Sequence, residues 1–384
     1  MLKSKISLRY VAPVLLSFFV ASFCDLVGIG VDRVKSDFEL SNTLVQLIPS
    51  VVFLWFFVLS VPVGILQDRI GKRKVLNLGM LITLLGMLLP FFFYSFTMVL
   101  TGFAFLGIGN TIVQVSANPL LVDVVPSSHR SSYLSLSQFV KSVGSMVAAP
   151  LAGWFAIQYG DWKILFLVFG LVSFIAIIWL TSTKIEETKN TEQRATFMSS
   201  FNLLGNSFIS LMVLGIFLIV GIDVGVNSVS GQYLLTKFGS EQTLAESGRS
   251  FYFFGKMLGT FGGAILLSKV SSRKFFIWSS VMGLVSISSL LIIPSENVAL
   301  IIIFIIGLGI SNIFPLIYSL TVEQFPTRAN EISGLMIMAI AGGAVLPLLM
   351  GWVSDLYNVG TSIIVLLLAV SVILITSIKV AKKT

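Results

Sequence analysis

The sequence predicts an all-α membrane protein with twelve transmembrane helices, arranged as two pseudo-symmetric bundles of six. Of its 384 residues, 56% are hydrophobic and only 11% are charged, whereas a soluble globular chain carries about 25% charged residues. The mean hydropathy is +0.98, so a water-soluble core cannot hide this much apolar surface. We therefore expect a lipid bilayer to surround most of the chain.

Apolar runs along the chain support this fold class. Runs of about 20 apolar residues are long enough to cross a bilayer as α-helices. The predicted spans are residues 8–31, 44–66, 75–94, 97–121, 133–158, 162–182, 207–235, 249–268, 275–294, 298–320, 332–354 and 361–379.

The one long polar connection lies between the sixth and seventh predicted spans. It divides the chain into an N-terminal six-helix bundle (1–182), a cytoplasmic linker (183–206) and a C-terminal six-helix bundle (207–384). These are the predicted domains.

The two halves repeat each other at an offset near 200 residues. A repeat of six spans is typical of transporters built from two pseudo-symmetric bundles, with a binding site between them. The matched pairs are Gly107-Ile-Gly109 with Gly307-Leu-Gly309, Pro126 with Pro326, Arg73-Lys74 with Arg273-Lys274, Gly153-Trp154 with Gly351-Trp352, and Asp25 with Asp223.

The basic residues predict the orientation. With the amino terminus in the cytoplasm, 18 of the 25 Lys and Arg residues fall on that side, 5 fall on the other, and two lie inside spans. Cytoplasmic loops carry an excess of Lys and Arg, so we expect a multi-pass protein of the inner cell membrane with both termini in the cytoplasm. The first segment, which begins with Lys3, Lys5 and Arg9, is predicted to be a retained helix and not a signal peptide.

Composition excludes several functional classes. The single cysteine, Cys24, excludes an intramolecular disulfide and a cysteine metal cluster, and the single histidine, His129, excludes a multi-histidine metal site. The net charge of +8 is explained by basic cytoplasmic loops, so we predict no nucleic-acid partner. The sequence contains no nucleophile–base set and no phosphate-binding loop beside a strand. We therefore expect no enzymatic activity, no metal and no cofactor.

A short loop between the second and third predicted spans carries a motif. It reads Gly64-Ile-Leu-Gln-Asp68-Arg69-Ile-Gly71-Lys72-Arg73-Lys74 and resembles the signature loop of the major facilitator superfamily. Its glycines permit a tight turn and close helix approach, and Asp68 can accept hydrogen bonds from helix N-terminal N–H groups and from arginines. The predicted gating residues are Gly64, Asp68, Arg69, Gly71 and Arg73.

Four further stretches resemble the fucose:proton symporter family of that superfamily. The resemblance implies the major facilitator fold and sugar uptake driven by a proton gradient. Two positions depart from the family pattern, because Gln114 stands where the family usually has a glutamate important for proton coupling and Lys141 stands where it typically has an asparagine near the sugar. The stretches are Gln114-Val-Ser-Ala-Asn118-Pro119, Leu136-Ser-Gln138-Phe-Val-Lys141-Ser-Val-Gly144, Phe314-Pro315-Leu-Ile-Tyr-Ser319 and Met338-Ala-Ile-Ala-Gly342-Gly343.

Four charged residues lie in the interior of predicted spans, away from their ends: Asp25, Lys141, Asp223 and Lys256. A charge within a span costs roughly 2.5–3.5 kcal/mol on insertion scales, so it faces a cavity or a partner. We predict that these four residues couple the movement of protons or sodium to that of the substrate. The structural alternative is that lysine–aspartate pairs hold the two bundles together. No acidic residue is expected at the level of Lys141, which favours substrate oxygen atoms or an exchangeable proton as its partner.

Polar residues at helical spacing mark the predicted substrate site. The 1.5 Å rise per residue of a helix places Asp25, Asp223 and Lys256 in an outer tier, and Lys141 in an inner tier. The expected substrate is a small molecule, either a sugar or an acidic sugar derivative. The predicted substrate-binding residues are Lys141, Gln138, Gln114, Asn118, Asn110, Asn227, Tyr252 and Asn312.

The sequence leaves two other functions open. One is efflux of drugs or metabolites by antiport, because the stretch Gly144-Ser-Met-Val-Ala-Ala-Pro150-Leu-Ala-Gly153 loosely resembles the Gly/Pro motif of antiporters in the superfamily. The other is a non-transporting membrane sensor. A sensor would need neither intramembrane charges in both halves nor an intact gating loop.

Overall fold

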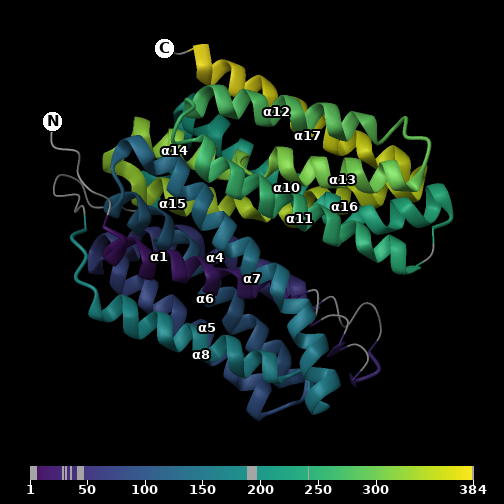
Figure 1. Ribbon diagram of the computed structural model, residues 1–384. Helices are drawn as coiled ribbons and strands as arrows, with labels where there is room; N and C mark the ends of the chain where they lie inside the picture. The colour runs from purple at the N-terminus through teal and green to yellow at the C-terminus, as the bar shows by residue number, and fades with distance from the viewer. Residues whose placement is uncertain are drawn as a thin grey trace. The chain divides into compact units, whose positions relative to one another are not determined.

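A computed structural model describes residues 7–27, 30, 33–34, 37–40, 47–187, 197–240 and 242–382. Every regular element in this part of the chain is a helix, as the sequence predicts (Figure 1). The first half forms α1 (Leu8–Ala21), η1 (Ser22–Leu26), α4 (Leu47–Ile70), α5 (Lys72–Phe92), α6 (Phe96–Val124), η2 (Ser127–His129), α7 (Arg130–Tyr159) and α8 (Ile164–Ser182).

The second half forms a corresponding series of helices. Within it, α12 and α17 run side by side (Figure 1). The elements are α9 (Phe197–Asn202), η3 (Leu203–Gly205), α10 (Ser207–Phe238), α11 (Gln242–Leu266), α12 (Ser272–Ser289), α13 (Glu296–Ile310), α14 (Ile313–Gln324), η4 (Pro326–Arg328), α15 (Ala329–Met338), η5 (Ala339–Ala341), α16 (Gly342–Leu356) and α17 (Val359–Lys382).

Ten helical stretches among the described residues have the length and hydropathy of membrane spans. The predicted spans 249–268 and 275–294 fold as α11 and α12 but are not among these ten. Both are less apolar than the others, since α11 carries Arg249 and Lys256 and α12 is rich in serine. The all-helical fold class is confirmed.

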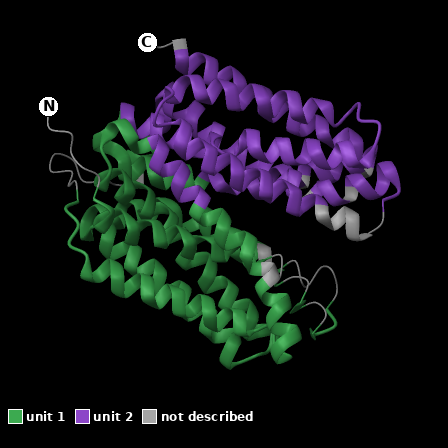
Figure 2. Ribbon diagram, in the orientation of Figure 1, with its two compact units in different colours: residues 1–130, 140–202, 325–338 green, residues 131–139, 203–324, 339–384 purple. Residues whose placement is uncertain are grey.

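The chain divides into two compact units by its internal contacts (Figure 2). The first unit contains Met1–Arg130, Val140–Asn202 and Phe325–Met338. The second contains Ser131–Phe139, Leu203–Gln324 and Ala339–Thr384. α7 therefore contributes residues to both units, and α15 packs with the helices of the N-terminal half.

The matched glycines of the sequence repeat have equivalent places in their units. A Cβ added at Gly107 would lie 2.7 Å from a backbone oxygen of α4, and one added at Gly307 would lie 2.2 Å from a backbone oxygen of α11. The second glycine of each pair lies against another neighbour: Gly109 contacts α5, and Gly309 contacts α12. Each Gly-x-Gly thus lets one helix cross two neighbours at close range.

The first predicted span is not one continuous α-helix. α1 ends at Ala21, and residues 22–26 form the 3₁₀ turn η1. Asp25 lies on this turn, so the 3.6-residue period of an α-helix does not describe which way residues 22–26 face.

One aspartate joins three connecting segments of the first unit. The Asp37 carboxylate accepts hydrogen bonds from the Tyr94 hydroxyl and, at 3.0 Å, from the Trp162 indole nitrogen. The Lys163 ammonium lies 4.4 Å from the centre of the Tyr94 ring. Burial and the nearby carboxylate raise the pKa of Tyr94 far above its usual value, so its hydroxyl stays a hydrogen-bond donor at physiological pH.

Prolines interrupt the hydrogen bonding of the spans in which they stand. A proline has no N–H to donate to the carbonyl four residues earlier. At Pro315 the result is a break, because α13 ends at Ile310 and α14 begins at Ile313. At Pro119 the helix α6 continues without a break, and the freed carbonyl belongs to Val115.

Ser333 of α15 satisfies that freed carbonyl. Its hydroxyl donates to the backbone oxygen of Val115 at 2.6 Å, and the Ser333 side chain is fully buried. A buried carbonyl without a partner costs about 1–3 kcal/mol. The hydroxyl of α15 thus replaces the N–H that Pro119 removed from α6.

We expect Ser333→Ala to lower the free energy of unfolding by about 1–3 kcal/mol, because it leaves the Val115 carbonyl without its partner. In a Pro119→Ala background the same change should cost clearly less, since the backbone N–H that this substitution restores can then bond to the Val115 carbonyl. Denaturant unfolding of the four proteins in detergent measures this coupling as a double-mutant cycle. Equal costs in both backgrounds would contradict it.

Candidate functional site

Lys141 and Asp25 both stand at the contact between α7 and η1, where Ser145, one helical turn after Lys141, contacts Asp25. The contact is close, because a Cβ added at Gly144 would lie 2.1 Å from the Ser22 hydroxyl oxygen. The Ser145 hydroxyl contacts the Asp25 carboxylate as a donor and also lies 3.1 Å from the Lys141 carbonyl oxygen. The two predicted tiers are therefore adjacent in the first unit, and Ser145 connects them.

Lys141 differs from the other partly buried lysines in its surroundings. Lys72, Lys163 and Lys256 each have a carboxylate oxygen within 4.0 Å. No described carboxylate lies that close to the half-buried Lys141 ammonium. A positive charge inside a span without such a partner is a candidate for binding an anionic group.

The polar stripe of α6 forms a ladder of hydrogen bonds. Gln114 Nε2 donates to Asn110 Oδ1 at 2.6 Å, and Asn118 Nδ2 donates to the Gln114 carbonyl oxygen at 2.8 Å. Asn110 Nδ2 donates to the carbonyl oxygen of Ala21, the last residue of α1, at 2.7 Å. All three side chains are buried, so they hold the turn that carries Asp25 in place.

The second unit contains a three-residue charged cluster between α10 and α11. Lys256 Nζ lies 2.6 Å from Asp223 Oδ2, and the Tyr252 hydroxyl donates to the other oxygen of the same carboxylate. Tyr252 is fully buried, whereas the side chains of Lys256 and Asp223 are 24% and 29% exposed. The structure thus brings together three residues that the sequence assigned to coupling and binding.

The remaining predicted binding residues have separate environments. Asn312 lies in the break between α13 and α14, and its Nδ2 donates to the Gly259 carbonyl oxygen at 2.7 Å. Asn227, one turn after Asp223, is half-buried, and its side-chain oxygen has no hydrogen-bond partner in the described part of the chain. Gln138 is half-buried on α7, one turn before Lys141.

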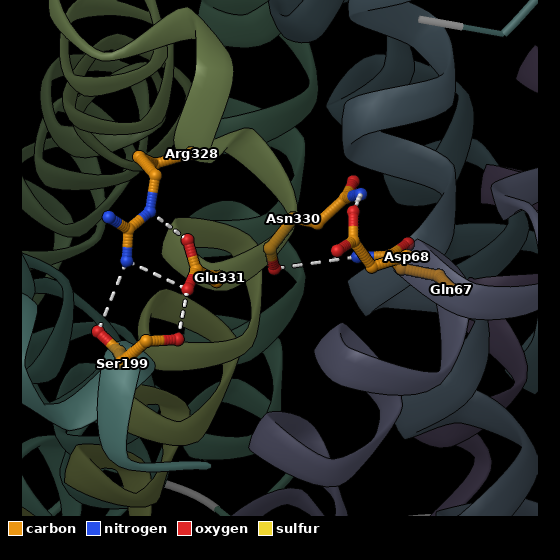
Figure 3. A network of polar contacts seen from close by, with 6 residues as sticks. All are labelled: Gln67, Asp68, Ser199, Arg328, Asn330 and Glu331. Carbon is orange, nitrogen blue, oxygen red and sulfur yellow. Dashed lines mark hydrogen bonds and ion pairs between the residues drawn. The ribbon is translucent and has the colours of Figure 1, made fainter. Parts of the chain in front are cut away.

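The predicted gating loop contacts α15, within the first unit. A Cβ added at Gly64 would lie 2.9 Å from the Asn330 backbone oxygen and 3.4 Å from the Gly334 Cα. Asn330 Nδ2 donates to Asp68 Oδ1 at 3.0 Å, and Gln67 Nε2 donates to the Asn330 carbonyl oxygen at 3.4 Å (Figure 3). We call this contact of Gly64, Gln67 and Asp68 with Asn330 and Gly334 the α15 latch.

The linker helix α9 contacts the amino-terminal end of α15. The Glu331 carboxylate, 5% exposed, pairs with Arg328. It also accepts a hydrogen bond at 2.6 Å from the Ser199 hydroxyl (Figure 3). Arg328 Nη2 in turn lies 3.3 Å from the Ser199 carbonyl oxygen. A helix of the predicted linker thus fixes the element that forms the latch.

Glu187 accepts the hydrogen bonds of a helix amino terminus next to the predicted gating loop. Its carboxylate accepts from the backbone N–H groups of Lys72 at 2.6 Å and Arg73 at 3.2 Å, at the start of α5. Gly71 precedes them with a φ of 96°, a conformation that favours glycine. Arg69, the remaining predicted gating residue, is exposed.

Several residues of these contacts were missed by sequence reasoning. Asp123 pairs with Lys72 Nζ at 2.5 Å, with both side chains at most 7% exposed. Asp123 follows the fourth predicted span and Glu187 lies in the predicted linker, so both read as loop charges. Asn330 and Ser333 were not assigned a role. For Ser333 one signal exists in the sequence, because Pro119 frees the Val115 carbonyl, which then needs a donor from another helix.

Gly64→Ala should lower the melting temperature of the purified protein, because its Cβ would press on backbone atoms of α15 that cannot rotate away. Gly351→Ala is the matched control, since nothing lies within 4 Å of a Cβ added there. Alanine favours a helix interior over glycine by about 1 kcal/mol, so the control should be neutral or stabilising. Equal losses in both variants would show that the α15 latch is not closely packed.

Asp223→Asn should lower the free energy of unfolding by about 1–3 kcal/mol, less than the roughly 3–5 kcal/mol for a fully buried pair, because it strands the Lys256 ammonium. Asp161→Asn is the control, since its pair with Lys163 is longer, at 3.4 Å, and its carboxylate is more exposed, at 38%, so the change should cost under about 1 kcal/mol. Denaturant unfolding of both variants compares the two losses. A smaller loss for Asp223→Asn would refute the role of this ion pair.

Comparison with known proteins adds the family. The sequence profile of the Major Facilitator Superfamily matches residues 13–339. A glucose/galactose transporter of Brucella abortus biovar 1 (strain 9-941) is 26% identical, over 88% of this chain and 86% of that protein. The sialic acid transporter NanX of Escherichia coli (strain K12) is 23% identical, over 89% and 86%.

The fold comparison agrees with the profile. A crystal structure of the E. coli fucose:proton symporter FucP matches this chain with a TM-score of 0.82 and 20% identity, covering 97% of this chain and 99% of that one. The match confirms the fold expected from the sequence. The chain belongs to the major facilitator superfamily, and it is a multi-pass membrane secondary transporter and not an enzyme.

Proposed function

We propose that this transporter imports an acidic sugar or a related sugar derivative together with protons. The observation that carries the proposal is the Lys141 ammonium, which lies in a span without a described carboxylate within 4.0 Å. Lys256, the other intramembrane lysine, is neutralised by Asp223. A substrate carboxylate would supply the partner that Lys141 lacks.

The relatives support a sugar as the substrate. Their names describe transport of glucose and galactose in one case and of sialic acid, an acidic sugar, in the other. At the position of Lys141 the symporter family typically has an asparagine, and the positive charge of the lysine favours an acidic sugar over a neutral one. The matching fucose:proton symporter supports protons as the coupling ion, with sodium as the alternative.

Two carboxylates are proposed to carry the coupling. Asp25 is exposed and bound by the Ser145 hydroxyl, so a proton can reach it without breaking an ion pair. Asp223 is held by Lys256 and Tyr252, and its protonation would release the lysine. Because each carboxylate shares its cluster with a predicted binding residue, proton binding and substrate binding can influence each other.

The proposed cycle is alternating access, with the α15 latch as a contact that forms in one state and opens in another. Both termini are proposed to lie in the cytoplasm, on the evidence of the basic residues. The latch would then lie at the cytoplasmic ends of the spans. Its hydrogen bonds are few and part of them involve neutral amides, which suits a contact that must break in every cycle.

Thermal stabilisation of the purified protein by ligands tests the substrate class, because a ligand of the folded state raises its melting temperature. Sialic acid should stabilise the wild type more than glucose or galactose. Lys141→Gln should weaken the effect of the acidic sugar by about 10- to 100-fold in affinity, the worth of one charge-assisted hydrogen bond. Lys379→Gln, at an exposed position near the end of α17, should change nothing.

Uptake into proteoliposomes tests the coupling. An inward proton gradient should accelerate uptake of the stabilising sugar, and Asp25→Asn should weaken this acceleration. If lipophilic cations stabilise the protein and sugars do not, efflux of drugs or metabolites replaces import. If neutral sugars stabilise wild type and Lys141→Gln alike, the sugar proposal stands and its acidic form is wrong.

A further inference from the structure

A cavity of about 700 Å³ lies within the second unit, apart from the predicted substrate residues. Its walls come from the end of α10, the residues that follow α12, the end of α16 and the start of α17. The volume falls within the roughly 300–1,000 Å³ of small-molecule sites. None of the residues assigned above to binding or coupling lines it.

One lysine supplies a fixed positive charge to this cavity. Lys237 Nζ donates to the Tyr233 hydroxyl oxygen at 2.8 Å and to the Leu290 carbonyl oxygen at 3.1 Å. It also lies 5.1 Å from the centre of the Tyr233 ring and 5.5 Å from that of Phe238, within the range of cation–π attraction. These partners hold the ammonium in place, and all of them are neutral.

The charge of Lys237 is therefore uncompensated by the carboxylates whose side chains the structure describes. No oxygen of those groups lies within 4.0 Å of its ammonium. Lys163 also lies over a tyrosine ring, but its ammonium is paired with a carboxylate, that of Asp161 at 3.4 Å. An anion is the ligand that the Lys237 environment lacks.

Polar side chains of the opposite wall can add to anion binding. Ser354, Asn358 and Thr361 line the cavity. The Asn358 side-chain oxygen accepts from the Thr361 backbone N–H at 2.9 Å and from its hydroxyl at 3.1 Å. This use of the oxygen leaves the amide N–H groups of Asn358 as donors for a ligand in the cavity.

Exposed apolar side chains line the same cavity. Leu291 is 42% exposed and Ile364 is 46% exposed. In a membrane protein such side chains contact lipid acyl chains, and Lys237, one residue from the end of α10, lies where a lysine reaches the head-group region. A cation and hydrogen-bond donors thus border directly on a lipid-facing apolar surface.

We propose that this cavity binds an anionic phospholipid. The lipid phosphate lies on Lys237 with the Asn358 amide as a further donor, and an acyl chain lies along Leu291 and Ile364. Phosphate and acyl chain are the two parts of one molecule that match the two parts of the cavity, whereas a soluble anion would leave the apolar part uncovered. Basic pockets between transmembrane helices bind anionic head groups on the cytoplasmic side, and the same pairing of charges applies at the end of α10, on the opposite side in the proposed orientation.

The test measures the melting temperature of delipidated protein in detergent with added phosphatidylglycerol, phosphatidylcholine or inorganic phosphate. Phosphatidylglycerol should stabilise the wild type, and Lys237→Gln should weaken its binding at least about fivefold. Lys237→Arg should retain binding. Lys163→Gln is the matched control, because it removes a lysine that is already paired, and it should behave as wild type.

Three results would overturn the proposal. If phosphatidylcholine stabilises the protein as much as phosphatidylglycerol, the negative charge of the lipid plays no role. If inorganic phosphate stabilises it as much, the cavity is a site for soluble anions. Equal loss in Lys237→Gln and Lys163→Gln would show a general effect of surface charge. Retention of phosphatidylglycerol binding by Lys237→Arg, which restores only the charge, excludes misfolding as the cause of the loss in Lys237→Gln.

Discussion

The absence of water from the bilayer interior is the constraint on which this structure depends. Every buried backbone group that leaves its helical hydrogen bond must find another partner within the protein. The Asn110 amide binds the last carbonyl of α1, the Asn312 amide binds a carbonyl of α11, and the Ser333 hydroxyl binds the carbonyl that Pro119 frees. The polar side chains of the spans are thus first of all structural, and they fix the turn that carries Asp25 and the break between α13 and α14.

The cluster around Asp25 and the cluster around Asp223 have similar hydrogen bonds but differ in the position of their lysine. In each unit an aspartate accepts a hydroxyl hydrogen bond, from Ser145 in the first and from Tyr252 in the second. In the second unit a lysine completes the cluster, with its ammonium 2.6 Å from Asp223. In the first unit the lysine lies one helical turn before Ser145, and no described carboxylate lies within 4.0 Å of its ammonium. Of the two lysines, only Lys256 is thus paired with a described aspartate of its own cluster.

The helices, their order and the glycine contacts were predictable because they depend on hydropathy and on local sequence. The buried stripe of Asn110, Gln114 and Asn118 was likewise predictable from its four-residue spacing, whereas the hydrogen bonds that join it into one ladder were not. Partners that are distant in sequence were not predictable. Glu187 at the start of α5 and Asn330 at Asp68 reach their partners only through the packing of whole helices, on which a single sequence carries no local signal.

The segment that was predicted only to connect the two bundles is itself bound to other helices, through Glu187 and Ser199. Both contacts bind this segment to the first unit, at the start of α5 and at α15. Ser199 binds α15 and Glu187 binds α5, so the proposed opening of the α15 latch would change the distance between these two contacts. The number of residues between 187 and 199 would then set how far α15 can move from α5, and among natural relatives this number should have a lower limit.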